Sequence, residues 1–93
     1  MKTRIKKTAE SLKQTVTNFT RELIRIPSIT GNEAQVIERI KTEMDHIGYE
    51  DIQIDNMGNL RGKLGSGNKI LAIDGHVDTV EVGKPQYWEF DPF

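Results

Sequence analysis

Lys69-Ile70-Leu71-Ala72-Ile73-Asp74 contains the longest unbroken apolar run of this sequence, from Ile70 to Ile73. A half-buried strand would alternate apolar and polar side chains, so an unbroken run between turn residues predicts a β-strand with both faces covered. Two helices and a hairpin are not enough chain to cover both faces of such a strand. The run therefore predicts one strand of a larger α/β sheet.

Two shorter segments before this run are expected to pair as a hairpin. Residues 52–54 alternate apolar and polar side chains, and residues 60–64 form the returning strand, which Gly62 interrupts. Asn56-Met57-Gly58-Asn59 has the composition of a turn. The Gly-Ser-Gly of residues 65–67 forms a second turn, and it does not open a helix as a phosphate-binding loop does.

Two amphipathic helices are predicted before the hairpin. Apolar side chains recur every three or four residues over 9–25, and Pro27 ends this helix. The second helix is expected to begin at Thr30, where Thr30 and Glu33 have the spacing of a capping box, and to end at Gly48 in a left-handed cap. Both helices are expected to pack on the sheet through Leu12, Val16, Phe19, Leu23, Val36, Ile40 and Met44.

Length and composition exclude several classes of protein. With 93 residues, the chain forms one domain at most. Thirteen basic and 14 acidic residues give a net charge of −1, so no global field attracts nucleic acid or an anionic membrane, and neither is an expected partner. The absence of cysteine excludes disulfides, thiolate metal sites and a Cys nucleophile, and it fits a reducing, cytoplasmic location. Residues 1–8 are expected to be a flexible basic terminus, with one domain over 9–93.

His76 and Asp78 directly follow the expected buried strand. Ligands of open α/β sheets bind beyond the carboxyl ends of strands, and residues two apart in an extended chain point to the same side. An imidazole can bind a divalent metal through one nitrogen while a carboxylate holds the other. A surface histidine beside an aspartate would show the same pattern, so the residues alone leave both interpretations open. The other histidine, His46, is expected to interact with the dipole of the second helix.

Gly75-His76-Val77-Asp78-Thr79-Val80 resembles the G-H-x-D-T-V signature of the M20 metallopeptidase family. Four further segments resemble family motifs in the same order, so the resemblance covers about residues 12–93. They are Ile26-Pro27-Ser28, Gly31-Asn32-Glu33, Asn56-Met57-Gly58-Asn59-Leu60 and Trp88-Glu89-Phe90-Asp91-Pro92-Phe93. Glu81 stands where many members have proline, and the Asp-Thr-Val-Glu-Val-Gly run is similar to the YgeY-like subgroup of selenium-metabolism-linked hydrolases.

The resemblance implies the N-terminal part of a zinc-peptidase-like α/β domain, with two helices followed by a three-stranded segment of a larger mixed sheet. It also implies hydrolysis of amide bonds in N-acyl amino acids or short peptides. His76 would be one ligand of a two-metal Zn²⁺ site, with Co²⁺ or Mn²⁺ as other candidates. Asp78 would be the catalytic-site carboxylate that holds its ring.

The family's general base and its other metal ligands match no residue of this sequence. Residues 9–93 are therefore expected to be part of a metal-binding catalytic domain that is inactive on its own. The complete protein is expected to be a homodimer. The alternative is a stand-alone, non-catalytic α/β interaction module, or a remnant, that pairs with a partner through open strand edges.

Overall fold

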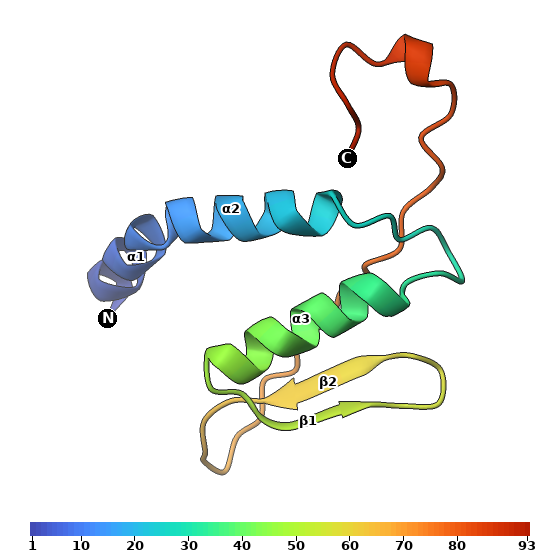
Figure 1. Cartoon of the computed structure of the whole chain (residues 1–93). Helices are drawn as coiled ribbons and strands as arrows, with labels where there is room; N and C mark the ends of the chain where they lie inside the picture. Colours follow the sequence, from blue (N-terminus) through green and yellow to red (C-terminus); the bar gives the residue numbers. More distant parts are fainter.

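The computed structural model describes residues 1–93 and has the predicted α/β class, with three α-helices and one two-stranded antiparallel sheet. The elements in chain order are α1 (Lys2–Ser11), α2 (Lys13–Ile24), α3 (Ala34–His46), β1 (Glu50–Ile54), β2 (Leu60–Lys63) and the 3-10 helix η1 (Pro85–Tyr87). In Figure 1, α3 lies between the hairpin and α2, and α1 continues from the far end of α2. None of the helices is both long enough and apolar enough to cross a membrane.

The hairpin is built around the side chain of Asp55, and its predicted turn is confirmed. Asp55 Oδ1 accepts hydrogen bonds of 2.9 Å from the backbone N–H groups of Met57 and Asn59. The Asn59 side-chain amide donates to Asp55 Oδ2 at 3.1 Å. The strands pair Glu50 with Lys63, Gln53 with Arg61 and Ile54 with Leu60, with an irregularity between Glu50 and Gln53.

The end of α3 brings this helix onto the hairpin. Gly48 has a φ of +94°, as the predicted left-handed cap requires. The N–H of Tyr49 donates to the carbonyl of Met44 at 2.9 Å and that of Gly48 to Asp45 at 3.2 Å, which is the Schellman pattern. A Cβ on Gly62 of β2 would lie 2.6 Å from Met44 Cε and 2.9 Å from Tyr49 Cδ1. A glycine at this position therefore allows α3 to approach the hairpin closely.

The predicted start of α3 is wrong. The helix begins at Ala34, and no side chain caps its first turn. Glu33 Oε1 instead accepts a hydrogen bond of 2.9 Å from the backbone N–H of Gly31, and the Thr30 hydroxyl donates to Asp78. The capping box does not form because a partner far along the chain takes the hydroxyl on which it depends.

The predicted single helix over 9–25 is two helices that meet at Leu12, where φ is −91° and ψ is −4°. The Ser11 hydroxyl donates to the carbonyl of Thr8 at 2.7 Å, and such bonds to the preceding turn commonly bend helices. The first helix also begins at Lys2, within the terminus expected to be flexible. That flexibility stays a prediction.

The third predicted strand, Lys69–Asp74, is wrong. The segment is neither strand nor helix, and Ile70 and Ile73 are 93% and 90% exposed. A strand needs a neighbour for its backbone N–H and C=O groups, and β2 pairs only with β1. No second partner strand exists within these 93 residues, so the apolar run stays irregular and uncovered.

The packing prediction holds for α3 and fails for α2. Val36 of α3 is 2% exposed, whereas Leu12 and Val16 remain about half exposed. Contact between α2 and α3 includes Arg39, which forms an ion pair with Glu22 at 2.8 Å and lies 4.9 Å above the ring of Phe19. The two-stranded sheet is covered by α3, and α2 lies beyond it.

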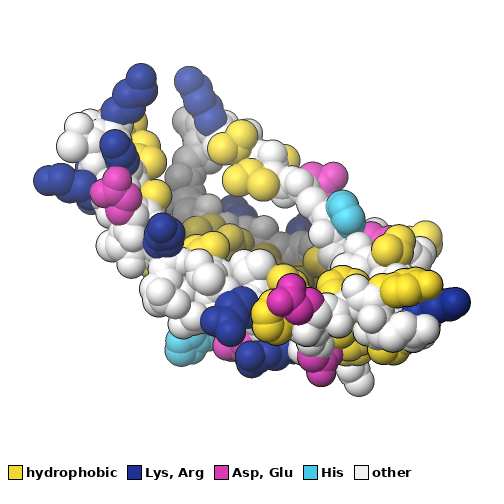
Figure 2. Space-filling model, turned by 90° about the horizontal axis from the view of Figure 1, so that it is seen from above, with side chains coloured by type: hydrophobic (Ala, Val, Ile, Leu, Met, Phe, Trp, Pro, Cys, Tyr) yellow, Lys and Arg dark blue, Asp and Glu magenta, His cyan; other side chains and the backbone are white.

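Much apolar surface is therefore exposed, as the apolar side chains on the face in Figure 2 illustrate. The accessible surface is 8681 Å², against about 5,500 Å² for a compact protein of this mass. The radius of gyration is 16.1 Å, against about 12 Å for a compact domain of this length. Only Val36 and Ser28 are buried. Val36 belongs to α3, and Ser28 lies at the candidate site.

Candidate functional site

Two loops that are far apart in sequence are joined next to His76. The Ser28 hydroxyl donates to the carbonyl of Val77 at 2.9 Å, and the N–H of Thr79 donates to the carbonyl of Ser28 at 2.9 Å. Ile29 and Thr79 form an isolated parallel bridge. Ser28 is 3% exposed, and this shielding from water strengthens its hydrogen bonds. Figure 1 shows this junction where the C-terminal segment passes the loop between α2 and α3.

His76 and Asp78 lie in direct contact at this junction. Nδ1 of His76 lies 2.9 Å from Oδ1 of Asp78 and 3.2 Å from the Asp78 backbone oxygen. Both partners are acceptors only, so Nδ1 carries the proton and donates. In a neutral ring with this tautomer, Nε2 has a free lone pair. The His76 side chain is 84% exposed, so this ring is accessible to a ligand from solvent.

The second oxygen of Asp78 is also held. The Thr30 hydroxyl donates to Oδ2 at 2.7 Å. The hydrogen bond from Thr30, followed by that from His76, lowers the pKa of Asp78 below the usual carboxyl range. Asp78 is therefore an anion at neutral pH with one oxygen on Thr30 and the other on the imidazole. This arrangement fixes the protonated nitrogen of His76 through a carboxylate.

His76, held by Asp78, fits one coordination position of a metal site. A histidine that binds a metal commonly donates its other ring N–H to a carboxylate, a backbone carbonyl or water, and Asp78 supplies such a carboxylate. A catalytic zinc site uses about three protein ligands, and no three His, Asp or Glu side chains of this chain lie close enough to hold an ion. His76 can therefore serve as one ligand among others. His46 lies in the last turn of α3, where its predicted interaction is with the helix dipole.

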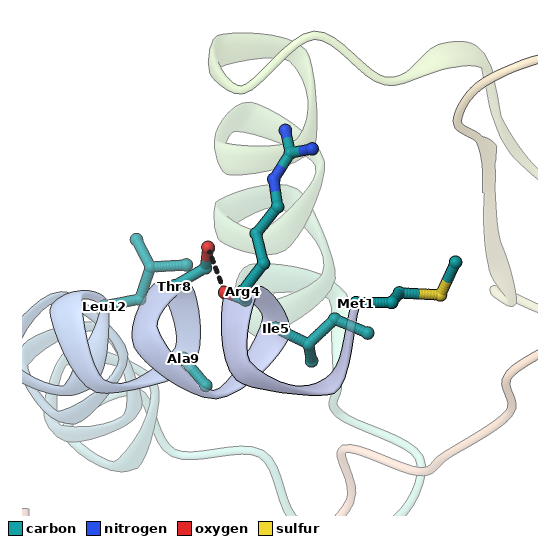
Figure 3. Close-up of a pocket in the computed structure, with 6 residues that line it drawn as sticks. All are labelled: Met1, Arg4, Ile5, Thr8, Ala9 and Leu12. Carbon is teal, nitrogen blue, oxygen red and sulfur yellow. Dashed lines mark hydrogen bonds between the residues drawn. The ribbon is translucent and has the colours of Figure 1, made fainter.

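The apolar hollow of Figure 3 is a separate feature on α1. It is lined by Met1, Arg4, Ile5, Thr8, Ala9 and Leu12. All of them belong to α1 or its two ends, and none is an acid or a histidine. The hollow is the uncovered face of a helix and offers no chemistry. A smaller hollow beside the junction is lined in part by Ser28, Thr79, Glu81 and Phe93.

The sequence-based interpretation missed the roles of Thr30 and Ser28. Thr30 was expected to cap α3, and Ser28 was part of a motif with no assigned contact. No local pattern links either residue to Asp78 or Val77, which follow almost fifty residues later. The motif segment Ile26-Pro27-Ser28 was the one available signal, because it marked this loop as a unit without showing its partner.

The motifs of this chain resemble those of the M20 metallopeptidase family, and a carboxylate that holds an exposed histidine is consistent with that resemblance. Comparison with known proteins confirms this resemblance. The chain is 40% identical over 85 residues to the uncharacterized protein YgeY of Escherichia coli K12, a match that covers 91% of this chain and 21% of YgeY.

Two enzymes are similar over nearly the same region. The succinyl-diaminopimelate desuccinylase of Ehrlichia canis is 33% identical over 82 residues, covering 81% of this chain and 21% of the enzyme. That of Methylocella silvestris is 30% identical over 89 residues, covering 88% and 23%. The chain thus spans about a fifth of the length of these relatives. No family profile and no solved structure matches it.

Proposed function

We propose that this chain supplies one metal ligand and its orienting carboxylate to a metal-dependent hydrolase that cleaves amide bonds of N-acyl amino acids or short peptides. The observation that carries the proposal is the 2.9 Å contact between His76 Nδ1 and Asp78 Oδ1, which leaves Nε2 free. The similarity to enzymes named for removing a succinyl group supports an acylated amino acid as the substrate.

In the proposed reaction, residues of this chain bind the metal ion and orient the side chain that holds it. His76 would hold the ion through Nε2, and Asp78 would keep the ring in the tautomer that this requires. Zn²⁺ is the expected metal, as a pair of ions, with Co²⁺ or Mn²⁺ as alternatives. When bound, a divalent ion would polarise the amide carbonyl and make water a better nucleophile. The general base and the other ligands match no residue here, so residues 1–93 alone are expected to be inactive.

The test is metal-dependent hydrolysis by the full-length protein. Purified protein should contain zinc and release product from N-acetyl or N-succinyl amino acids. A chelator should abolish turnover, and Zn²⁺ or Co²⁺ should restore it. Turnover that survives complete metal removal would contradict the proposal.

The protein is expected to act on a small molecule as a homodimer in the cytoplasm. Sedimentation of the same protein checks the homodimer, and cell fractionation checks the location.

The second candidate is a non-catalytic α/β interaction module. The exposed run from Ile70 to Ile73 favours it, because these apolar side chains are uncovered and residues 69–74 make no backbone hydrogen bond. Such a segment can add to the edge of a partner's sheet. A full-length protein without metal and without hydrolysis, in which Leu71→Lys abolishes a stable complex, would support this function instead.

A further inference from the structure

We infer that Thr30 is a positioning residue, whose hydroxyl holds Asp78 so that His76 keeps Nε2 free for a metal ion. That a metal ion binds to Nε2 rests on the proposed function. The effect of Thr30 on the tautomer of the His76 ring does not, because it concerns only contacts within this chain.

Thr30 removes the freedom that one hydrogen bond would leave to Asp78. With only the bond from Nδ1 to Oδ1, the carboxylate could rotate about its Cβ–Cγ bond and release the ring. The Thr30 hydroxyl donates to the other oxygen at 2.7 Å, so both oxygens have fixed partners. This restraint matters because the Asp78 side chain is 37% exposed and the His76 side chain 84% exposed, so little packing limits their motion.

The loop that carries Thr30 is itself attached to the segment that carries Asp78. Ser28 contacts the residues on both sides of Asp78. Its hydroxyl donates to the carbonyl of Val77 at 2.9 Å, and its carbonyl accepts from the N–H of Thr79 at 2.9 Å. Glu33 accepts from the N–H of Gly31 and holds the residue after Thr30. The two backbones therefore keep Thr30 and Asp78 at a fixed separation.

The Thr30 hydroxyl has no competing local role. The first turn of α3 has no side-chain cap, and the hydroxyl makes its one hydrogen bond to Asp78. A threonine that only stabilised the start of the helix would bond to backbone N–H groups of that helix. The observed partner is a side chain from the candidate site.

The first experiment measures the tautomer of the His76 ring in the metal-free, full-length protein labelled with ¹⁵N-histidine, in mildly alkaline solution. The wild type should show the proton on Nδ1. Thr30→Val keeps the shape and removes the donor, so the share of this tautomer should fall. Thr30→Ser should restore it, and Thr20→Val, which removes an exposed hydroxyl of α2, should leave it unchanged. A wild type without the Nδ1 proton, or a Thr30→Val protein with the wild-type tautomer, would overturn the inference.

The second experiment separates positioning from general damage to the fold. If Thr30 acts through Asp78, adding Thr30→Val to Asp78→Asn should change the tautomer no further than Asp78→Asn alone. Additive losses in the double variant would show a merely structural role and contradict the inference.

Zinc affinity of the same full-length proteins tests the link to the metal. Thr30→Val should weaken Zn²⁺ binding by about 10-fold, as loss of outer-shell partners commonly does, and Thr30→Ser should recover most of it. If the tautomer depends on Thr30 and the wild type binds no zinc, the proposed function fails and the positioning role stands. If zinc binds equally well to wild type and Thr30→Val, the positioning role is wrong.

Discussion

The backbone N–H of Thr79 donates a 2.9 Å hydrogen bond to the carbonyl oxygen of Ser28, and this bond ties the His76–Asp78 segment to the loop after α2. The Ser28 hydroxyl makes a second bond in the opposite direction, to Val77. The candidate site is thus held by a loop from the N-terminal half and not by a preceding strand. This explains how the contact between His76 and Asp78 forms although Lys69–Asp74 does not become a strand.

Replacing His76 by alanine in the full-length protein should reduce both zinc content and turnover to near background, because it removes the ring that is open to a metal. Metal analysis and a hydrolysis assay check this. His46→Ala is the matched control, since His46 is exposed in the last turn of α3 and should keep both properties. A zinc-replete and fully active His76→Ala protein would end the ligand interpretation.

Replacing Asp78 by asparagine should lower zinc affinity or turnover by about 10- to 100-fold. The amide keeps the size of the side chain but loses the charge that fixes the imidazole. Competition with a chelator gives the affinity. Asp45→Asn, on the exposed face of α3, should behave as wild type. An equally mild effect at both positions would mean that Asp78 only stabilises the turn.

The 93-residue chain alone should hydrolyse an N-acetyl amino acid no faster than buffer, with or without added zinc. It offers one well-placed imidazole, whereas a catalytic zinc site needs about three protein ligands. Residues of one catalytic unit act together, so the loss of several of them should remove most of the rate. A product-release assay over several hours checks this. Turnover that His76→Ala abolishes would show that these residues form a complete site.

The hairpin turn should weaken at acid pH because of Asp55. Hydrogen bonds from the backbone and then the side chain of Asn59 lower the pKa of Asp55 in the folded state. Its contribution is therefore complete above the usual carboxyl range and is lost as the pH falls through the lowered pKa. NMR shifts of the Met57 and Asn59 amides should report this titration, and Asp55→Asn should remove it. A pKa at or above the usual range would contradict the hydrogen-bonded turn.

Gly62→Ala should destabilise the packing of α3 on the hairpin by about 1 kcal/mol or more, because the new methyl group would overpack the contact with Met44 and Tyr49. Urea unfolding gives the change in free energy. Gly75→Ala is the control, since a Cβ there would have no atom within 4 Å and its φ is not positive. Equal effects at the two positions would show that α3 does not pack closely on β2.

Local patterns in the sequence were enough to predict the structural features that depend on residues close together in the chain. The apolar period of α3, the left-handed Gly48 and the turn at residues 56–59 depend on near neighbours, and each was predicted. The pairing of His76 with Asp78 is of the same kind, because two residues apart in extended chain already share a side. The M20 resemblance likewise followed from the order of short motifs.

Contacts between distant segments decided the rest. The apolar run at Ile70–Ile73 has the composition of a covered strand, but a strand forms only where another backbone accepts its hydrogen bonds, and none is in reach. Thr30 has the spacing of a helix cap, but Asp78 lies within 2.7 Å of its hydroxyl and takes the hydrogen bond. Composition and spacing thus determined which residues could act together. Which groups come within hydrogen-bonding distance across the fold was settled only in three dimensions, because that distance depends on how separate segments pack.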